Sequence, residues 1–526
     1  MKRTHLLAGA GTLSVFTIGA GFALAQQGVS PADAYPQGVD PLDTGFVESG
    51  LVDTGDVDSG LMETPVADPV TPIRGSTGRA RADDGPTEGG PVLTFGISST
   101  LSATDNYSLR PTNGDSAELF DTQLSFGYVN RRAIDELRFD MSGVLRAIEP
   151  PGANSRTFDS QRARLGYDRE GVNSTFGFGL DYDLTSVDAI DPFENDRFFE
   201  DDPLDETDLT QDQGERQQIG ARFSFETGLN DPIGFILTGR YRDRTYSGTT
   251  DPGLFDTQIY NLSGTTRLAL SPVTETRLVL GYEDYSADDT ALTDRRTTSA
   301  SLGLTHALSS TDTFDISVGL QDIETDETIL GTRRSETENG VIGSIGFSRE
   351  LAAGSIGTTF DLNDSVNGQS ATWLANRAWL LPRGSVELSL GVTSDVDDTI
   401  RPVGSVDFIH EMLRSTFSAS LSRQVATSTQ SNELRTTQVS LGYDYEINSI
   451  SSIGFATDYA EIEQIGSIVP DDTRRTNLRA TYSRSLTRDW QFSSGYEYRV
   501  REESGAGTAT SNRVFLTLQR DFVIRP

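Results

Sequence analysis

The chain has 526 residues, a formal net charge of −35 and no cysteine. The acidic balance argues against nucleic acid as a partner, because phosphate binding requires a basic surface. The absence of cysteine excludes disulfides, thiolate metal sites and a lipid-modified cysteine. Only 35% of the residues are hydrophobic. This excludes a helical membrane protein but fits a transmembrane β-barrel, whose strands alternate lipid-facing and lumen-facing side chains.

The first 25 residues have the pattern of a secretory signal peptide. A Lys-Arg pair gives the positive start, residues 6–22 are mostly apolar or small, and Ala-Leu-Ala at 23–25 matches the small-x-small cleavage rule. We therefore expect the mature chain to begin at Gln26. A retained anchor helix is the alternative; the Gly, Thr and Ala content of the stretch and the cleavage site favour the signal peptide.

Residues 26–90 form an acidic, low-complexity segment. They contain twelve Asp or Glu residues against three Arg, and four copies of a five-residue repeat occupy 44–63, the first being Thr-Gly-Phe-Val-Glu. Such a sequence buries too little apolar surface to offset the entropy lost on ordering. The segment is therefore predicted to be a disordered periplasmic tether. An array of short linear motifs, or a plug that folds only inside a lumen, are the alternatives.

From residue 91 onward, apolar and polar side chains alternate with a period of two, which is typical of a strand with one apolar and one polar face. In the clearest segment, 173–184, Phe176, Phe178 and Leu180 alternate with Gly and Asp residues. The pattern recurs along the chain, for example at 92–103, 119–129, 276–285, 313–321, 438–447, 490–500 and 512–522. These segments predict strands of about ten to fourteen residues.

The connections between the predicted strands alternate in length. Longer, polar and acidic ones, such as 104–116, 186–214, 324–335 and 502–511, lie between ten short ones. The short connections are 130–135, 169–172, 229–232, 271–275, 309–312, 351–354, 381–384, 410–414, 447–451 and 486–489. This alternation predicts an all-β fold over 91–526: a single antiparallel up-and-down transmembrane β-barrel of about 22 strands (range 20–24), with short turns in the periplasm and longer loops outside.

A soluble sandwich or β-helix is the alternative fold. A soluble chain of this length would divide into several domains joined by linkers, and no linker composition occurs after residue 90. The predicted strands also exceed the usual five to six residues of soluble sheets. Aromatic pairs near strand ends, such as Tyr443 with Tyr445 and Tyr282 with Tyr285, suit the aromatic belt of a membrane interface.

Two stretches carry a resemblance to Gram-negative outer-membrane β-barrels. They are the opening Leu-Thr-Phe-Gly-Ile at 93–97 with Thr-Asp-Asn-Tyr at 104–107, and the final strand with Thr-Leu-Gln-Arg-Asp-Phe at 517–522. More narrowly, residues 91–526 resemble the β-barrel porin proteins of alphaproteobacteria associated with exopolysaccharide systems. The resemblance implies a place in the cell outer membrane. The final strand also resembles the signal read by the outer-membrane assembly machinery.

The odd or even position of a residue along its strand, here called its parity, determines which face of the strand it occupies. Charged side chains are assigned to the lumen face, because charges facing lipid near the midplane are costly. The predicted lumen-facing charges are Asp181, Asp183, Arg222, Glu226, Arg240, Arg277, Glu283, Asp444, Arg479, Glu497 and Arg499. Both signs occur, so no single-sign filter emerges from them.

Barrel closure requires the last strand to pair with the first, because closure removes both exposed edges. The predicted closure residues are Phe95 near the start and Val514, Leu516, Leu518 and Phe522 at the end.

Nothing in the sequence predicts an enzyme, a cofactor or a metal. His306 and His410 adjoin short connections and are expected at the periplasmic end, and no metalloprotease, P-loop or hydrolase-elbow motif occurs. The acidic stretch 191–212 lacks the calcium-loop spacing. It is expected to be a solvated outer loop that enriches cations at the pore mouth.

We therefore expect a passive, porin-like channel for small solutes or an exported polymer. A non-conducting structural or adhesive surface barrel is the alternative. A TonB-dependent receptor ranks lower, because 26–90 is shorter than a receptor plug. The expected partners are outer-membrane lipid and lipopolysaccharide, the assembly machinery, and periplasmic or polysaccharide-export proteins that contact 26–90.

Overall fold

The fold was analysed in a computed structural model. It describes residues 90–112, 114–149, 158–190, 193, 206–210, 212–329, 331–394, 399–428, 432–465 and 472–525. The predicted signal peptide lies outside the described residues, as does the predicted acidic segment apart from Gly90.

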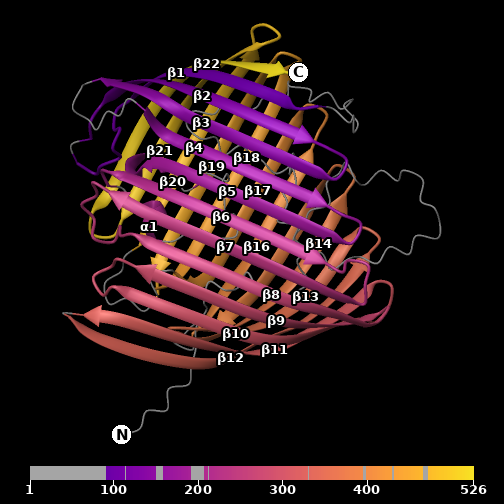
Figure 1. Cartoon of the computed structure of the whole chain (residues 1–526). Coiled ribbons are helices and arrows are strands. Elements are labelled where there is room, and N and C mark those ends of the chain that lie inside the picture. Colours follow the sequence, from indigo (N-terminus) through magenta and orange to yellow (C-terminus); the bar gives the residue numbers. More distant parts are fainter. Residues whose placement is uncertain are drawn as a thin grey trace.

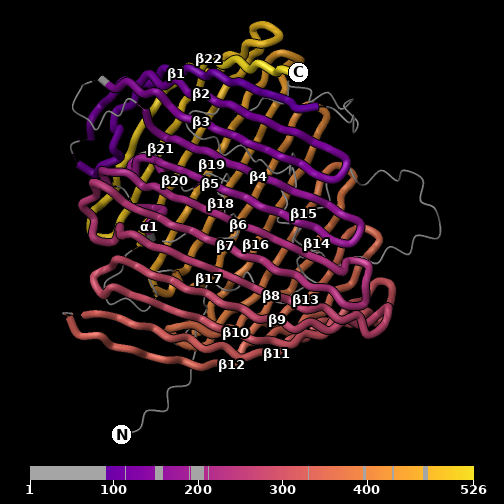
Figure 2. Tube along the Cα trace, in the orientation of Figure 1, coloured from indigo at the N-terminus to yellow at the C-terminus, as the bar shows by residue number. Residues whose placement is uncertain are grey.

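The described residues form one closed, antiparallel sheet of 22 strands (Figure 1). Each strand pairs with its neighbours in sequence, so the chain winds up and down around the barrel (Figure 2). The strands are β1 Val92–Thr104, β2 Ala117–Arg131, β3 Asp135–Glu149, β4 Phe158–Glu170, β5 Ser174–Ser186, β6 Glu215–Thr227, β7 Ile233–Ser247, β8 Thr257–Ser271, β9 Thr274–Ala287, β10 Thr293–Ala307, β11 Asp312–Ile329, β12 Thr332–Leu351, β13 Gly354–Ser365, β14 Gly368–Leu381, β15 Gly384–Ser394, β16 Ile400–Glu411, β17 Ser415–Thr427, β18 Glu433–Asn448, β19 Ser451–Gln464, β20 Thr473–Ser485, β21 Trp490–Glu503 and β22 Gly507–Ile524. The predicted all-β barrel of about 22 strands is confirmed.

Alternating side chains give the barrel an apolar outer face and a polar lumen. On β9, Leu278 and Leu280 are exposed on the outside, whereas Arg277, Val279 and Glu283 are buried on the inside. An exposed apolar surface around a closed barrel is the surface that lipid covers. The fold therefore places its apolar residues outward and its charges inward, the reverse of a soluble protein.

The first and last strands close the barrel. Phe95 lies opposite Phe522, and Ser99 lies opposite Leu518. Inside this seam the hydroxyl groups of Thr100 and Thr517 lie 2.9 Å apart, a hydrogen bond between residues 417 positions apart in the chain. Of the other closure residues, Val514 pairs with Ala103 and Leu516 with Leu101.

The ten predicted short connections join even-numbered strands to the next odd-numbered ones. The opposite end carries the longest connections, 105–116 and 187–214. We call the first end the inner end and the second the outer end. Gly354 and Gly384 begin β13 and β15 at two of the shortest turns with positive φ angles of 116° and 146°, a backbone conformation that favours glycine.

Two predicted outer loops are wrong. Residues 324–335 are mostly strand: β11 and β12 extend to a short turn, and Thr325 pairs with Glu336. The long polar loop predicted at 502–511 shrinks to three residues between β21 and β22. In both stretches mostly polar or small residues occupy both faces of the strands, so alternation could not reveal them.

One aromatic pair was also assigned wrongly. Tyr282 is exposed on the outside, but Tyr285 is buried in the lumen, with the Arg295 guanidinium 4.8 Å from its ring centre. An odd spacing of three residues puts the two rings on opposite faces of β9. Tyr285 therefore does not belong to the aromatic belt.

Helical structure is scarce. The described residues contain a 3₁₀ turn, Val187–Ala189, and the single-turn helix α1, Glu206–Leu209, both in the connection between β5 and β6. Within the described part of the chain, no helix is long and apolar enough to cross a membrane.

Candidate functional site

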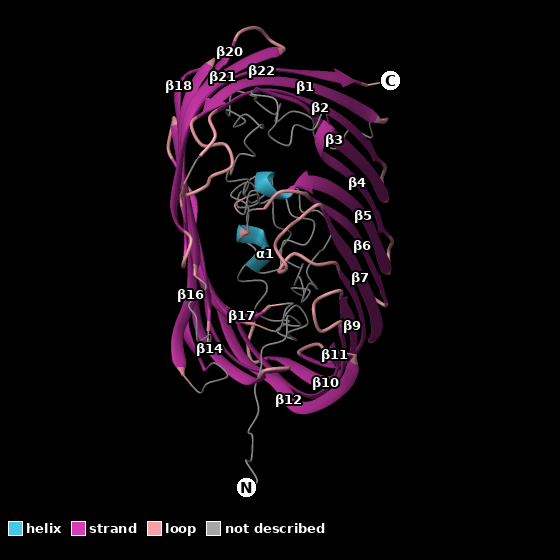
Figure 3. Cartoon of the chain, turned by 90° about the vertical axis from the view of Figure 1, so that its left-hand side faces the viewer, coloured by secondary structure: helices cyan, strands magenta, loops and turns pink. Residues whose placement is uncertain are grey.

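The outer half of the lumen is narrowed by connections that fold inward (Figure 3). They are the described parts of three connections: β1–β2 at 105–112 and 114–116, β5–β6 at 187–190, 193, 206–210 and 212–214, and β7–β8 at 248–256. Each contributes buried apolar side chains, among them Leu109, Val187 and Leu254. Apolar residues facing a polar lumen need a partner surface, and here the loops and the inner wall supply it to one another. We call the described residues of the β5–β6 connection the strap.

The strap crosses the lumen to the far wall. Leu209 of α1 packs in one buried cluster with Leu434 of β18 and with Ala460 and Ile462 of β19. In the strand order, β18 lies ten strands from β6 in one direction and twelve in the other, which is nearly half-way around the barrel. The apolar inward residues on β18 and β19 thus form a docking surface for the tip of the strap.

Arg475 on β20 fixes the strap at this far wall. Its Nη1 donates to the carbonyl oxygen of Ile190 at 3.2 Å, and its Nη2 donates to those of Leu209 at 2.9 Å and Thr210 at 3.4 Å. The side chain is buried, with 7% of its surface exposed. Hydrogen bonds from a charged donor are each stronger than neutral ones, so one arginine holds both limbs of the strap.

The strands next to the strap in sequence, β6 and β7, hold the same helix. The Arg216 Nη1 of β6 lies 3.5 Å from Asp208 Oδ1, and the Arg244 Nη1 of β7 donates to Thr207 Oγ1 at 3.0 Å. The residues of α1 therefore contact β6 and β7 on one side and β18 to β20 on the other. Together these contacts place α1 as a bridge across the lumen.

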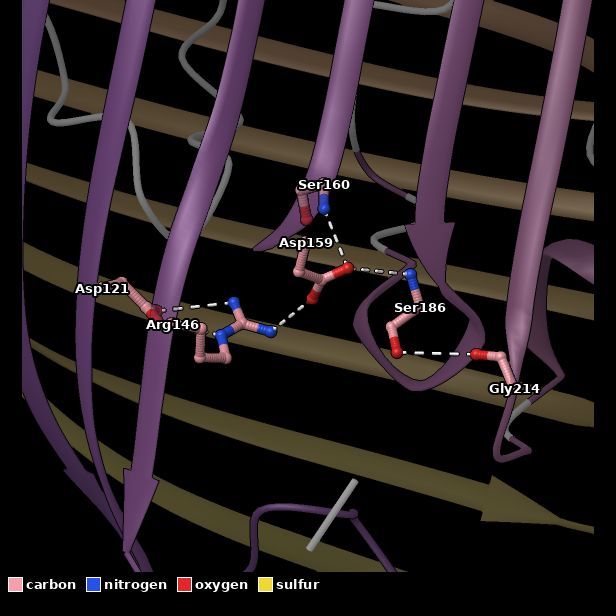
Figure 4. Close-up of polar contacts among 6 residues, drawn as sticks. All are labelled: Asp121, Arg146, Asp159, Ser160, Ser186 and Gly214. Atoms are coloured by element: carbon pink, nitrogen blue, oxygen red, sulfur yellow. Dashed lines mark hydrogen bonds and ion pairs between the residues drawn. The ribbon is translucent and has the colours of Figure 1, made fainter. Parts of the chain in front are cut away.

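An arginine between two carboxylates supports the base of the strap (Figure 4). Arg146 of β3 donates from Nε to Asp121 at 2.9 Å and from Nη1 to Asp159 at 2.8 Å. Asp159 Oδ1 accepts in turn from the backbone N–H of Ser160 at 2.8 Å and of Ser186 at 3.3 Å. Ser186 ends β5, so the network ties the start of the strap to β2, β3 and β4.

The β1–β2 connection packs beside this network. Tyr107 lies against a buried cluster of Ala117, Leu119 and Ile148. Burial raises the pKa of Tyr107 to about 12, and the negative charge of Asp188 in the strap adds to the rise. The phenol is therefore neutral at physiological pH. It fills space between the two connections without adding charge to the lumen.

The β7–β8 connection is bound to the other limb of the strap. The Asp212 carboxylate accepts hydrogen bonds from the N–H of Thr250, from Thr250 Oγ1 at 2.8 Å and from the N–H of Asp251 at 2.8 Å. Burial alone would raise the pKa of Asp212, but these hydrogen bonds outweigh it and hold the pKa below its ordinary value. A buried cluster of Val187, Ile190 and Leu254 joins the same two connections.

Several predicted lumen charges form ion pairs across neighbouring strands. Arg164 Nε lies 3.0 Å from Asp181, and Arg162 Nε lies 3.2 Å from Asp183. Glu497 on β21 is buried between Arg479 of β20 at 3.1 Å and Arg513 of β22 at 3.5 Å. We call the sector β2 to β7 with β20 to β22 the paired wall, because its carboxylates described here have arginine partners.

The remaining predicted charges lie at inward positions. Arg222 of β6 is directly opposite Arg240 of β7. Arg277 of β9 lies 2.5 Å from Glu275. Glu226, Glu283 and Arg499 share strand parity with buried inward residues of β6, β9 and β21. The two predicted histidines lie near the inner end, His306 beside Thr274 on β9 and His410 stacked on Phe408.

Asp444 belongs to a different sector. It faces inward on β18, as do Asp361 on β13, Glu387 on β15 and Asp407 on β16. Glu387 and Asp407 lie directly opposite each other. Asp407 accepts a hydrogen bond from Ser420 Oγ at 2.8 Å. Within the described strands none of these four carboxylates has an arginine within ion-pair distance. We call this sector, β13 to β18, the acid wall.

The sequence interpretation missed the residues that hold the strap. Arg475 has the same parity as the predicted lumen charge Arg479 on β20, so alternation could have placed it inward, whereas no lumen charge was predicted on β3, the strand of Arg146. Their partners in loops far along the chain carried no signal. Among the described residues, no cluster of three or more His, Cys, Asp or Glu side chains is arranged to hold a metal ion.

Solved structures share this fold. The ferric-catecholate import receptor Fiu from E. coli K12, in its open form, matches with a TM-score of 0.52 and 11% sequence identity, over 81% of each chain. The siderophore receptor PiuA from Acinetobacter baumannii matches with a TM-score of 0.50 and 10% identity, over 82% of each chain. No protein-family model and no curated protein matches the sequence. With its closed 22-stranded barrel and apolar outer face, the chain is an outer-membrane β-barrel.

Proposed function

We propose that this barrel is a passive, porin-like channel for small polar solutes, with a lumen constricted by its own outer connections. The observation that supports the proposal is the strap, which narrows a wide barrel from within. An empty barrel of 22 strands would be a large hole, and barrels of this size are usually filled. A strap anchored at both walls leaves passages beside it rather than one wide pore.

The direct test is conductance with the strap released or removed. Full-length protein in planar bilayers is compared with a variant in which residues 188–213 are replaced by a short Gly-Ser linker, and with Arg475→Ala. We expect a several-fold rise in single-channel conductance on deletion and a smaller rise for Arg475→Ala, because the far-wall anchor is lost. Arg484→Ala, on the same strand near the inner end, is the matched control. Equal conductance of the wild type and the deletion variant would reject the constriction.

A non-conducting structural or adhesive barrel is the second candidate. It is supported by the three buried apolar clusters that connect strap, loops and wall, because such contacts also suit a sealed lumen. The same bilayer experiment separates the two functions. Wild-type protein that gives no channels, together with a strap-deleted variant that does, favours the sealed barrel.

An uptake receptor is the third candidate, supported by the fold shared with Fiu and PiuA. A receptor binds its ligand tightly before transport, whereas a passive channel does not. If the purified protein bound a ferric catecholate tightly and vesicles showed no solute passage, the receptor function would be supported and the channel function rejected. Whether the channel passes an exported polymer is tested separately, by measuring the passage of oligosaccharides of increasing size.

A further inference from the structure

The tip of the β13–β14 hairpin leaves the barrel wall and lies over its inner surface. β12 and β13 stop pairing at Gly343 and Leu362, whereas β13 and β14 continue to pair as far as Ser365 and Gly368. Gln321 of β11 donates from Nε2 to the carbonyl oxygen of Asp364 at 2.9 Å. The tip is therefore held against β11 and β12 at the outer end.

This position brings two carboxylates together. A Cβ atom built on Gly340 of β12 would lie 1.7 Å from Asp364 Oδ2, so the carboxylate occupies the space that a side chain at 340 would fill. Glu338 lies two residues along the same strand and points to the same face. The Asp364 charge also acts directly on the Glu338 carboxyl group. The glycine thus opens the room in which the two acids meet.

Asp364 is buried and Glu338 is half-buried, and the buried oxygens of both lack a hydrogen-bond partner. Asp364 is 2% exposed, and neither of its oxygens has a hydrogen-bond partner among the described residues, nor has the buried Oε2 of Glu338. No described arginine or histidine forms an ion pair with either group. A buried charge is costly unless it is paired or coordinates a metal. Two adjacent negative charges therefore both need a positive partner.

We propose that Glu338 and Asp364 bind a hard divalent cation of the calcium type at the outer rim of the barrel. Calcium takes six to eight oxygen ligands, and two carboxylates supply up to four, with backbone carbonyl groups and water as the remainder. With only two acidic ligands the affinity falls in the range of extracellular calcium modules, a Kd on the order of 10⁻⁴–10⁻³ M.

The ion would brace the rim. The hydroxyl groups of Ser365 and Thr427 lie 3.4 Å apart, which links the hairpin tip to the end of β17. β15 and β16 lie between this hairpin and β17. They have eleven and twelve residues and are among the shortest strands of the barrel. A cation at Glu338 and Asp364 would join β12, the tip and β17 above this low part of the wall.

The test is calcium binding by the full-length, detergent-solubilised protein after removal of metal ions. Isothermal titration with CaCl₂ at pH 7.5 should find one site in the wild type. Binding should weaken at least tenfold in Asp364→Asn and in Glu338→Gln. Gly340→Ala keeps both carboxylates but displaces that of Asp364, and should also lose binding. Asp444→Asn removes an inward carboxylate far from the site and should bind as the wild type does.

Thermal unfolding of each variant provides a second measurement. Calcium should raise the unfolding temperature of the wild type and of Asp444→Asn, but not that of the other three variants, each shown to be folded by its sheet circular dichroism. The proposal is overturned if the wild type binds no calcium up to 10 mM, which would indicate carboxyl groups that share a proton. Unchanged binding by Asp364→Asn and Glu338→Gln would overturn it as well. Channel conductance enters neither measurement, so the outcome is independent of the proposed channel.

Discussion

The paired wall and the acid wall use the same kind of side chain in opposite ways. On the paired wall, Asp121, Asp159 and Glu497 each contact an arginine and are almost fully buried. On the acid wall, Glu387 faces Asp407 across two strands with no arginine near. Opposite charges in direct contact neutralise one another, whereas like charges directly opposite each other repel.

We infer that the paired wall supports the strap, whereas the acid wall sets the electrostatic field in the lumen. The paired wall holds the base of the strap through Arg146 and its far anchor through Arg475. Three of the acid-wall carboxylates, Glu387, Asp407 and Asp444, lie within five residues of the inner end of their strands. In the proposed channel, an ion that passes the strap would therefore meet these carboxylates next.

Breaking the paired wall should have the largest effect. Arg146→Leu leaves Asp121 and Asp159 buried without their partner, and loss of one member of a buried pair costs about 3–5 kcal/mol. We expect the free energy of unfolding in urea, measured in lipid vesicles, to fall by that order. Conductance should rise because Ser186 loses its support.

The matched change on the acid wall is Asp407→Asn. It removes a like charge opposite Glu387 and should leave the free energy of unfolding unchanged or slightly higher. If Arg146→Leu and Asp407→Asn altered stability equally, the distinction between the two walls would be lost.

The acid wall should control ion preference. The double variant Glu387→Gln and Asp407→Asn removes two inward carboxylates, and rings of acidic side chains favour cations. We expect the cation-to-anion permeability ratio, taken from reversal potentials at pH 8, to fall about twofold. Glu350→Gln, at the inner end of β12, serves as the control. An unchanged permeability ratio in the double variant would show that charges outside the acid wall set the ion preference.

A smaller effect should follow from acid. The pKa of Asp212 is lower in the folded protein than in an unfolded chain, so its contacts with the β7–β8 connection stabilise the fold at pH values above the ordinary Asp pKa of about 3.9. That stabilisation is lost as the pH falls below about 3.9 and through the folded pKa. Spin labels on the strap and on the β7–β8 connection should separate as the pH is lowered through the folded pKa of Asp212, and in Asp212→Asn they should be separated already at pH 7. Labels that stay together in the variant would contradict this role.

Strand alternation was sufficient to predict most of the fold. The segment 173–184 became β5 with Leu180 outward and Asp181 inward, and the ten short connections fall at the inner end. Prediction failed where both faces of a strand meet water. In 324–335 the cross-strand partners are polar, as with Thr325 and Glu336, so no periodicity marked the strands.

The constriction could be predicted only in part. Parity indicates which charges face the lumen, but it does not indicate which of them bind one another or a loop. Arg475 and Leu209 are 266 residues apart, and their contact depends on the curvature of the whole barrel. Asp361 and Asp407 have inward parity like Asp444, but their strands are weakly patterned, so neither was among the predicted lumen charges. Glu387 lies on a clearly alternating strand, and its inward position could have been predicted.

The seam between β1 and β22 determines the order in which this molecule can be made. Every other pair of neighbouring strands is adjacent in the sequence, so its contacts are of short range along the chain. The seam joins residues some four hundred positions apart, and contacts of such long range form slowly. Until β22 pairs with β1, the sheet therefore has two free edges that invite pairing with other chains. The open sheet is thus the most aggregation-prone stage in the assembly of the barrel, and a chain that stops before Gly507 lacks the strand that closes it.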